Sequence, residues 1–258
     1  LLQLPGVKAV YRDYAHDLDL YASIPLINAV AAWNNAAIGG MENAGEGIKI
    51  ASVDGGLHKD APMFDGTGYE YPPGYPRGDT RNTNGKIIVS RAYFRTWDPP
   101  LPGEENPWPG EDSDSHGLHT ASIAAGNEVV ATYEGFTETI SGVAPKAYLM
   151  SYRAFYPGVF GGGAYSAELI AALEDVVADG ADVVNNSWGG RGSSGGAFDP
   201  VDMALINAWN AGVFVSMANG NDGPNPGTGS HPSPEYINVA ASTTTGYFGY
   251  GRLLVSAP

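Results

Sequence analysis

The sequence predicts an α/β fold in which a mostly parallel sheet is wound with helices. Short apolar runs, each beside a Gly-bearing turn, are typical of buried parallel strands. Between about residues 145 and 217 these runs alternate with helical patterns, which is the order that a parallel sheet requires. The 258 residues suit a single domain, and a hydrophobic content of 43% is enough for a sizeable core.

The individual elements follow from apolar spacing and from Gly and Pro positions. We expect strands at residues 48–53, 147–152, 181–185 and 213–217. A helix over 165–179 ends at Gly180, because its apolar residues share one face: Leu169, Ile170, Leu173, Val176 and Val177. A second helix begins at Asp199-Pro200, since Pro suits the first helical position, and ends at Gly212. Pro- and Gly-rich residues 69–83 and 98–110 are predicted surface loops.

Composition excludes several classes of function. The 28 acidic and 13 basic residues give a net charge of −15, which repels phosphate backbones and argues against nucleic acid as a partner. The chain has no cysteine, so disulfides, thiolate nucleophiles and Cys-ligated zinc are excluded. No apolar run reaches the ~18 residues that span a bilayer, and we therefore expect no membrane partner.

Asp54 ends the first predicted strand and is followed by Gly55-Gly56. Catalytic groups of open α/β sheets lie at the carboxyl ends of strands. An Asp at a strand end is also a common turn former, so Asp54 gains a functional meaning only together with other motifs.

His116 opens a segment of small residues at helical spacing, which predicts a helix that packs closely against its neighbour. A histidine held in a first helical turn suits a general base near neutral pH, although a capping or core histidine fits the local sequence as well. Asp112, Asp114 and His116 imitate a calcium loop, but its twelfth position is Ile123 rather than a carboxylate. His116 and His119 are three apart instead of four, so the sequence predicts no metal site.

Two further strand ends carry polar turns. Ser187-Trp188-Gly189 lies in a Gly-rich turn that exposes backbone donors and acceptors to an extended peptide. In Asn219-Gly220-Asn221, the amide of Asn221 can donate to a developing oxyanion. Each segment alone also fits an ordinary strand end or turn. Asn185 begins an N-glycosylation pattern that we expect to be unused at the end of a buried strand.

Taken in order, these segments resemble the motifs of the subtilase family, the subtilisin-like peptidases of S8 type. Residues 50–56 resemble the family's Asp motif, and His116–His119 resembles its His-Gly-Thr-His motif with Leu118 in place of Thr. Ser187-Trp188-Gly189 resembles the Ser-Leu-Gly motif. Asn219-Gly220-Asn221 resembles Ala-Gly-Asn, with Asn219 in place of a small apolar residue.

Flanking segments extend the resemblance over roughly residues 25–245. Residues 142–147 are similar to the family's Gly-Val-Ala-Pro turn. Residues 84–88 and 120–122 are similar to members with an inserted protease-associated domain, the plant cucumisin-like group and bacterial relatives.

The resemblance implies a subtilisin-like three-layer fold and a serine endopeptidase with an Asp-His-Ser triad. His116 would take the proton from the nucleophilic serine and return it to the leaving amine, and Asp54 would orient the imidazole of His116. Asn221 would complete the oxyanion hole, and His119 would be structural. The substrate cleft would be formed by Ser187, Trp188, Gly189, Asn219 and Gly220. The implied partners are polypeptide substrates and the protein's own inhibitory prodomain, in a secreted zymogen. No cofactor is expected; structural calcium is compatible with the family, but no loop of this sequence indicates a site for it.

The nucleophile departs from the family pattern. No segment after Asn221 resembles Gly-Thr-Ser-Met-Ala, and Ser256 has neither Gly-Thr before it nor a helix after it. We therefore expect residues 21–258 to be an incomplete, inactive catalytic domain, truncated at the C-terminus, with an inserted domain and the serine following in the parent protein.

Other interpretations remain for the ends and for the function. Residues 1–20 are expected to be the tail of an inhibitory prodomain or an N-terminal strand. A non-catalytic homologue that binds peptides is the main functional alternative, motivated by the absent serine, Leu118 and Asn219. A metal hydrolase built on Asp112, Asp114, His116 and His119 is a distant third.

Overall fold

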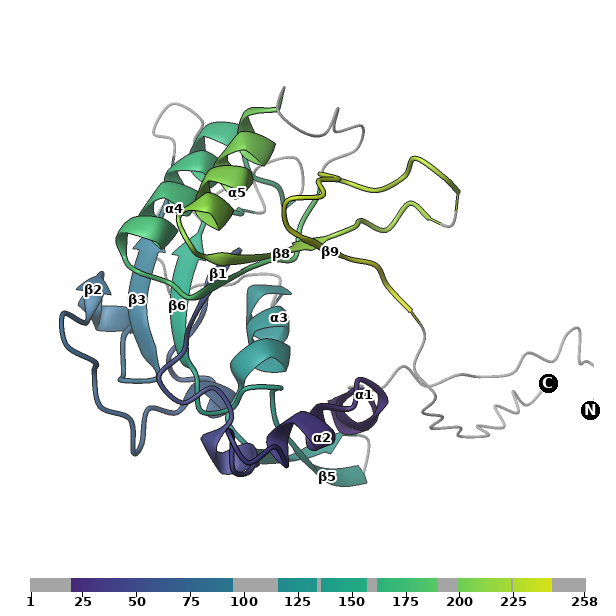
Figure 1. The fold of residues 1–258 in the computed structure, drawn as a ribbon. Coiled ribbons are helices and arrows are strands. Elements are labelled where there is room, and N and C mark those ends of the chain that lie inside the picture. Colours follow the sequence, from purple (N-terminus) through teal and green to yellow (C-terminus); the bar gives the residue numbers. More distant parts are fainter. Residues whose placement is uncertain are drawn as a thin grey trace, which may run out of the picture.

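The computed structural model describes residues 20–94, 116–133, 136–156, 162–189, 199–223 and 225–242. Its main feature is a seven-stranded parallel sheet with the strand order β2-β3-β6-β1-β7-β8-β9 (Figure 1). The strands of this sheet are β1 (Lys49–Asp54), β2 (Arg77–Gly78), β3 (Ile87–Ala92), β6 (Tyr148–Arg153), β7 (Val183–Asn186), β8 (Phe214–Ala218) and β9 (Ile237–Val239). A separate antiparallel pair consists of β4 (Val129–Tyr133) and β5 (Phe136–Ile140).

The helices α1 (Leu20–Leu26) and α2 (Ala29–Trp33) precede the first strand of the sheet in the chain, and the helices α3 (His116–Ala125), α4 (Ser166–Ala178) and α5 (Pro200–Asn210) pack against its faces. The described residues also form three 3₁₀ turns: η1 (Met41–Asn43), η2 (Pro62–Phe64) and η3 (Thr80–Asn82). Within the described ranges, no helix is long and apolar enough to cross a bilayer.

The four predicted strands are β1, β6, β7 and β8, and the three predicted helices are α3, α4 and α5, so the predicted parallel α/β fold is confirmed. Gly180 and Gly212 follow α4 and α5 with φ of +80° and +97°, a left-handed conformation that ends helices and suits glycine. The predicted loop over residues 69–83 is partly wrong, because Arg77–Gly78 pairs with β3 as an edge strand of the sheet.

Alternating side chains of the strands divide the core into two parts. Ala51 and Met150 belong to the cluster that packs under α4 and α5, whereas Ile50 and Leu149 belong to the cluster that packs under α3. Because successive residues of a strand point to opposite faces, the two helix layers lie on opposite sides of the sheet. Figure 1 shows this three-layer arrangement.

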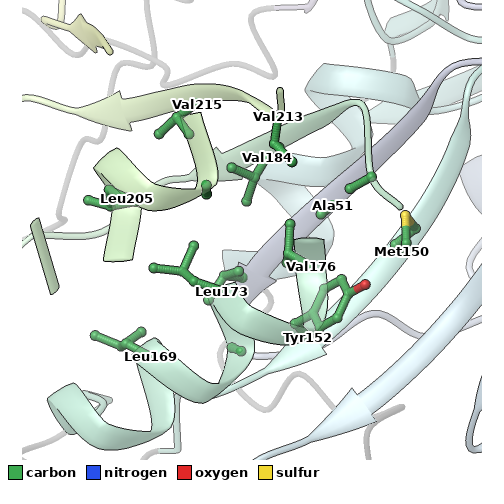
Figure 2. Packing of buried hydrophobic residues seen from close by; sticks show 14 of the residues in the cluster. Ala51, Met150, Tyr152, Leu169, Leu173, Val176, Val184, Leu205, Val213 and Val215 are labelled. Carbon is green, nitrogen blue, oxygen red and sulfur yellow. The ribbon is translucent and has the colours of Figure 1, made fainter. Parts of the chain in front are cut away.

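The larger cluster lies between the sheet and the helices α4 and α5. Figure 2 shows Leu173 and Val176 of α4 beside Val184 of β7, with Leu205 of α5 next to Val215 of β8. Leu173 is only 1% exposed, and a leucine side chain buried to this extent stabilises the fold by roughly 1.5–3 kcal/mol. This packing holds the strands whose ends carry the predicted site.

Lys86 is a fully buried cation that precedes β3. Its Nζ donates hydrogen bonds to the carbonyl oxygens of Pro145 and Ala147 and to the hydroxyl of Tyr69. Burial, together with the nearby charge of Lys146, lowers the pKa of Lys86 to about 7. The hydrogen bonds of Lys86 thus hold the turn before β6 in place, and the cost is that the buried ammonium loses its contact with water.

Candidate active site

Asp54 occupies the carboxyl end of β1, the central strand of the sheet. Its side chain is buried, and Oδ1 accepts a hydrogen bond of 2.7 Å from the backbone N–H of Gly55. Its backbone carbonyl accepts from the N–H groups of Ala154 and Phe155, which follow β6. The carboxylate is therefore held in a fixed position at the edge of the sheet.

His116 is the first residue of α3, and its imidazole lies against Asp54. Nδ1 is 2.9 Å from Oδ1 and 3.0 Å from Oδ2 of the carboxylate. The side chain of His116 is 49% exposed, whereas that of Asp54 is 6% exposed. Since a carboxylate only accepts hydrogen bonds, Nδ1 carries the proton, and the neutral imidazole then has Nε2 as its acceptor.

Close packing places α3 where this contact can form. Gly117, Ala121 and Ala125 are its buried residues, as expected for a helix of small side chains. A Cβ on Gly142 would lie 2.5 Å from the backbone nitrogen of Gly126, so no side chain fits where the chain passes the end of α3. The predicted close approach of this helix is confirmed.

Thr120 is a member of the site that the sequence reasoning missed. Its Oγ1 lies 3.3 Å from Oδ2 of Asp54 and also 3.3 Å from the backbone carbonyl oxygen of Gly117, so its single proton is shared between these two acceptors. Thr120 follows His116 by four residues, and residues at this spacing lie on the same side of a helix. The four-residue spacing from His116 was therefore the sequence signal that could have identified Thr120.

The segment Ser187-Trp188-Gly189 follows β7, the strand beside β1. The Ser187 hydroxyl exchanges hydrogen bonds with the side chain of Asn185 at 2.9 and 3.2 Å. Trp188 is 9% exposed, and its ring centroid lies 6.0 Å from that of Phe155. Phe155 follows β6, and no pattern in the sequence linked it to Trp188.

Asn219-Gly220-Asn221 follows β8, the next strand along the sheet. Gly220 has a φ of +88°, which turns the chain away from the strand. Asn221 is exposed and lines a hollow with Asn219, Gly220 and the loop 225–229. Ser230 from the end of that loop donates its backbone N–H to the carbonyl of Asn219.

Parallel pairing brings these segments to one edge. Ser52 is in register with Asn185, and Asn186 is in register with Met217, so β1, β7 and β8 end on the same side of the sheet. Only Asp54 and His116 of the predicted residues are in direct side-chain contact among the described interactions; 187–189 and 219–221 occupy the two neighbouring strand ends.

Other predicted positions have different outcomes. His119 is exposed on α3, three residues after His116. Asp112, Asp114 and Ser256 lie outside the described residues, as do residues 1–19. The structure therefore does not test the calcium loop or the metal hydrolase that would depend on Asp112 and Asp114.

Comparison with known proteins agrees with the order of these motifs. The model of the "Subtilase family" matches residues 45–248. The subtilisin-like protease SBT2.2 of Arabidopsis thaliana is 36% identical over 234 residues, covering 80% of this chain and 26% of that protein. The subtilisin-like protease SBT1.4 of the same plant is 30% identical over 258 residues, covering 93% of this chain and 32% of that protein.

The chain thus spans between a quarter and a third of the length of these relatives. The matched region contains every motif described above, from the Asp54 strand to the Asn221 turn. With its family match, its parallel three-layer fold and its relatives, this chain belongs to the subtilase family.

Proposed function

We propose that this chain contributes Asp54 and His116 to the Asp-His-Ser triad of a serine endopeptidase. One observation supports this above all others. The half-exposed imidazole of His116 holds its Nδ1 at 2.9 Å from the buried carboxylate of Asp54. A buried carboxylate that fixes one imidazole nitrogen leaves the other for proton transfer.

In the proposed mechanism, Nε2 of His116 takes the proton of the nucleophilic serine and later gives it to the leaving amine. Asp54 fixes the tautomer and stabilises the imidazolium that forms. Thr120 acts as a positioning residue through its hydrogen bond to Asp54. The serine itself is proposed to lie in sequence outside residues 1–258, so this chain alone would be inactive.

The proposed substrates are polypeptides in extended conformation. Ser187, Trp188 and Gly189 would pair with the substrate backbone on one side of the cleft, beside Asn219 and Gly220. Asn221 would donate its amide to the oxyanion, which suits its exposed position at a strand end. We further propose that residues 1–20 belong to an inhibitory prodomain, residues 21–258 to the catalytic domain, and that the zymogen is secreted.

The deciding experiment is fluorophosphonate labelling of the full-length gene product, with the adduct mapped by mass spectrometry. We expect one label, on a serine outside residues 1–258, that disappears in His116→Ala. The matched control is His119→Ala on the exposed side of the same helix, which should label normally.

A folded full-length protein that takes no label would refute the triad. The family alternative, a non-catalytic homologue that binds peptides, would then replace it; Leu118 and Asn219 depart from the family motifs and motivate that alternative. Peptide binding without turnover, measured by calorimetry, would identify this second function.

A further inference from the structure

Asp199, Asp202 and His231 form a cluster of potential metal ligands behind the strand ends. One ligand atom of each lies within 4.8 Å of the other two. Asp199 caps α5, Asp202 lies in its first turn, and His231 belongs to the segment between β8 and β9. Asp202 and His231 are buried, and Asp199 is half-buried.

The carboxylate of Asp202 is only half satisfied. Its Oδ1 lies 2.7 Å from Nδ1 of His231 and 3.2 Å from the hydroxyl of Tyr236. Tyr236 has a single hydroxyl proton, and the carbonyl oxygen of His231 at 2.7 Å is its nearer acceptor. Oδ2 of Asp202 is buried and has no hydrogen-bond partner among the described residues. Such a buried oxygen is costly unless something else binds it.

Asp199 can bind a ligand without giving up its cap. Its Oδ1 accepts from the backbone N–H groups of Val201 at 2.8 Å and Asp202 at 3.4 Å. A carboxylate has about four acceptor positions, so Oδ2 remains available. Two carboxylates supply two negative charges, which outweigh the roughly +0.5 charge of the α5 N-terminus.

We propose that Asp199, Asp202 and His231 bind a divalent transition-metal ion of the Zn²⁺ class. Imidazole favours Zn²⁺ and similar ions, whereas Ca²⁺ and Mg²⁺ prefer oxygen ligands alone. Three side chains with a water as the fourth ligand give the tetrahedral coordination usual for zinc. On binding, the ion replaces the proton that Nδ1 of His231 shares with Asp202, and that proton leaves to solvent.

The site is positioned to support the substrate segments. The ring of His231 packs edge-on against Trp188, with centroids 5.5 Å apart. A Cβ on Gly189 or Gly220 would lie 2.6 Å or 2.9 Å from Oγ of the neighbouring Ser230. An ion that joins α5 to His231 would therefore fix the wall of the cleft. This consequence rests on the proposed function, but the binding of the ion does not.

The test is calorimetric titration of the chelator-treated full-length protein with ZnCl₂ and, separately, CaCl₂. We expect one Zn²⁺ per chain and at least about a 100-fold loss of affinity in Asp202→Asn and His231→Gln, because ligands matter more than their supporting residues. His58→Gln is the matched control. His58 and Asp60 form an exposed pair of the kind that binds Zn²⁺ non-specifically at a protein surface. The His58→Gln variant should bind Zn²⁺ as the wild type does.

Asp199→Asn keeps the test decisive if the buried variants do not fold. Asn caps helices as well as Asp does, so thermal stability without metal should be unchanged while Zn²⁺ affinity falls at least about tenfold. Unchanged affinity in this variant would overturn the site, and so would loss of binding in His58→Gln. Absence of Zn²⁺ binding would mean a buried Asp202–His231 pair only. Serine labelling is measured separately, so failure here leaves the proposed protease function standing.

Discussion

Nδ1 of His116 lies 2.9 Å from the carboxylate of Asp54, although 62 positions separate the two residues in the chain. The carboxyl end of β1 and the first turn of α3 meet at this contact. One residue is buried and the other half-exposed, and this asymmetry suits the general-base role that we propose for His116.

Asp54→Asn should abolish most activity of the full-length protein. The amide would donate to Nδ1 and favour the wrong imidazole tautomer, so kcat should fall about 10⁴-fold. Steady-state kinetics on a peptide substrate measure this, with His119→Ala as the control that keeps its kcat. A loss below about tenfold in Asp54→Asn would contradict the assigned role.

Thr120→Val should lower kcat about tenfold and leave KM unchanged. The variant removes the hydroxyl 3.3 Å from Asp54, and hydrogen bonds to charged groups contribute ~1.5–3 kcal/mol, with the long distance favouring the lower value. Thr120→Ser retains the hydroxyl and should keep most of the activity. Equal losses in the two variants would instead indicate packing by the methyl group.

Asn221→Ala should lower kcat by about 10²–10³ with little change in KM, because an oxyanion donor acts mainly in the transition state. Asn225→Ala is the matched control, since Asn225 lines the same hollow and is also exposed. If the two alanine variants behave alike in steady-state kinetics, Asn221 is not the donor.

Lys86 predicts a pH dependence of stability. Its pKa is lowered to about 7 in the folded protein, so the charged form is favoured on unfolding, and stability falls as the pH drops from about 10 to 7. The free energy of unfolding should lose roughly 3 kcal/mol over this range through Lys86, and this loss should be missing in Lys86→Met.

Urea denaturation at pH 7 and pH 10 measures the difference. Lys49→Met is the control and should keep the wild-type pH dependence, because the Lys49 ammonium is partly exposed and paired with Asp182 at 2.7 Å. A Lys86→Met variant with the same pH dependence as the wild type would show that the buried ammonium is stabilised by its three hydrogen bonds.

The sequence was most informative where the spacing of apolar residues and the positions of glycines indicated the same element boundaries. The strands β1, β6, β7 and β8 are apolar runs near Gly, and α4 and α5 end at Gly180 and Gly212, so both patterns were readable. The edge strands β2 and β9 span two and three residues, which is too short for any period. The apolar start of β3 was present in the sequence but adjoins a Pro- and Gly-rich stretch, and it was missed.

The candidate site was predictable to the extent that it depends on strand ends. Asp54 and Asn221 follow strands of one parallel sheet, and this topology alone places them at a common edge. Pairing across the core was not predictable. Asp199 and Asp202 have helical spacing, but nothing local links them to His231, which reaches Asp202 through a loop 29 residues later.

The strand order has a consequence for how the protein is made. β1 pairs only with β6 and β7 in the sheet, and Lys49 of β1 bonds to Asp182, 133 residues further along. At about 5–20 residues per second, the ribosome needs roughly 7 to 27 seconds to span that distance. The apolar central strand has no native strand beside it until β6 is made, since Lys49 pairs with Tyr148, and it lacks β7 for the whole interval. Non-local parallel pairing is itself slow. Any chaperone or accompanying segment that shields β1 early would therefore raise the yield of folded protein.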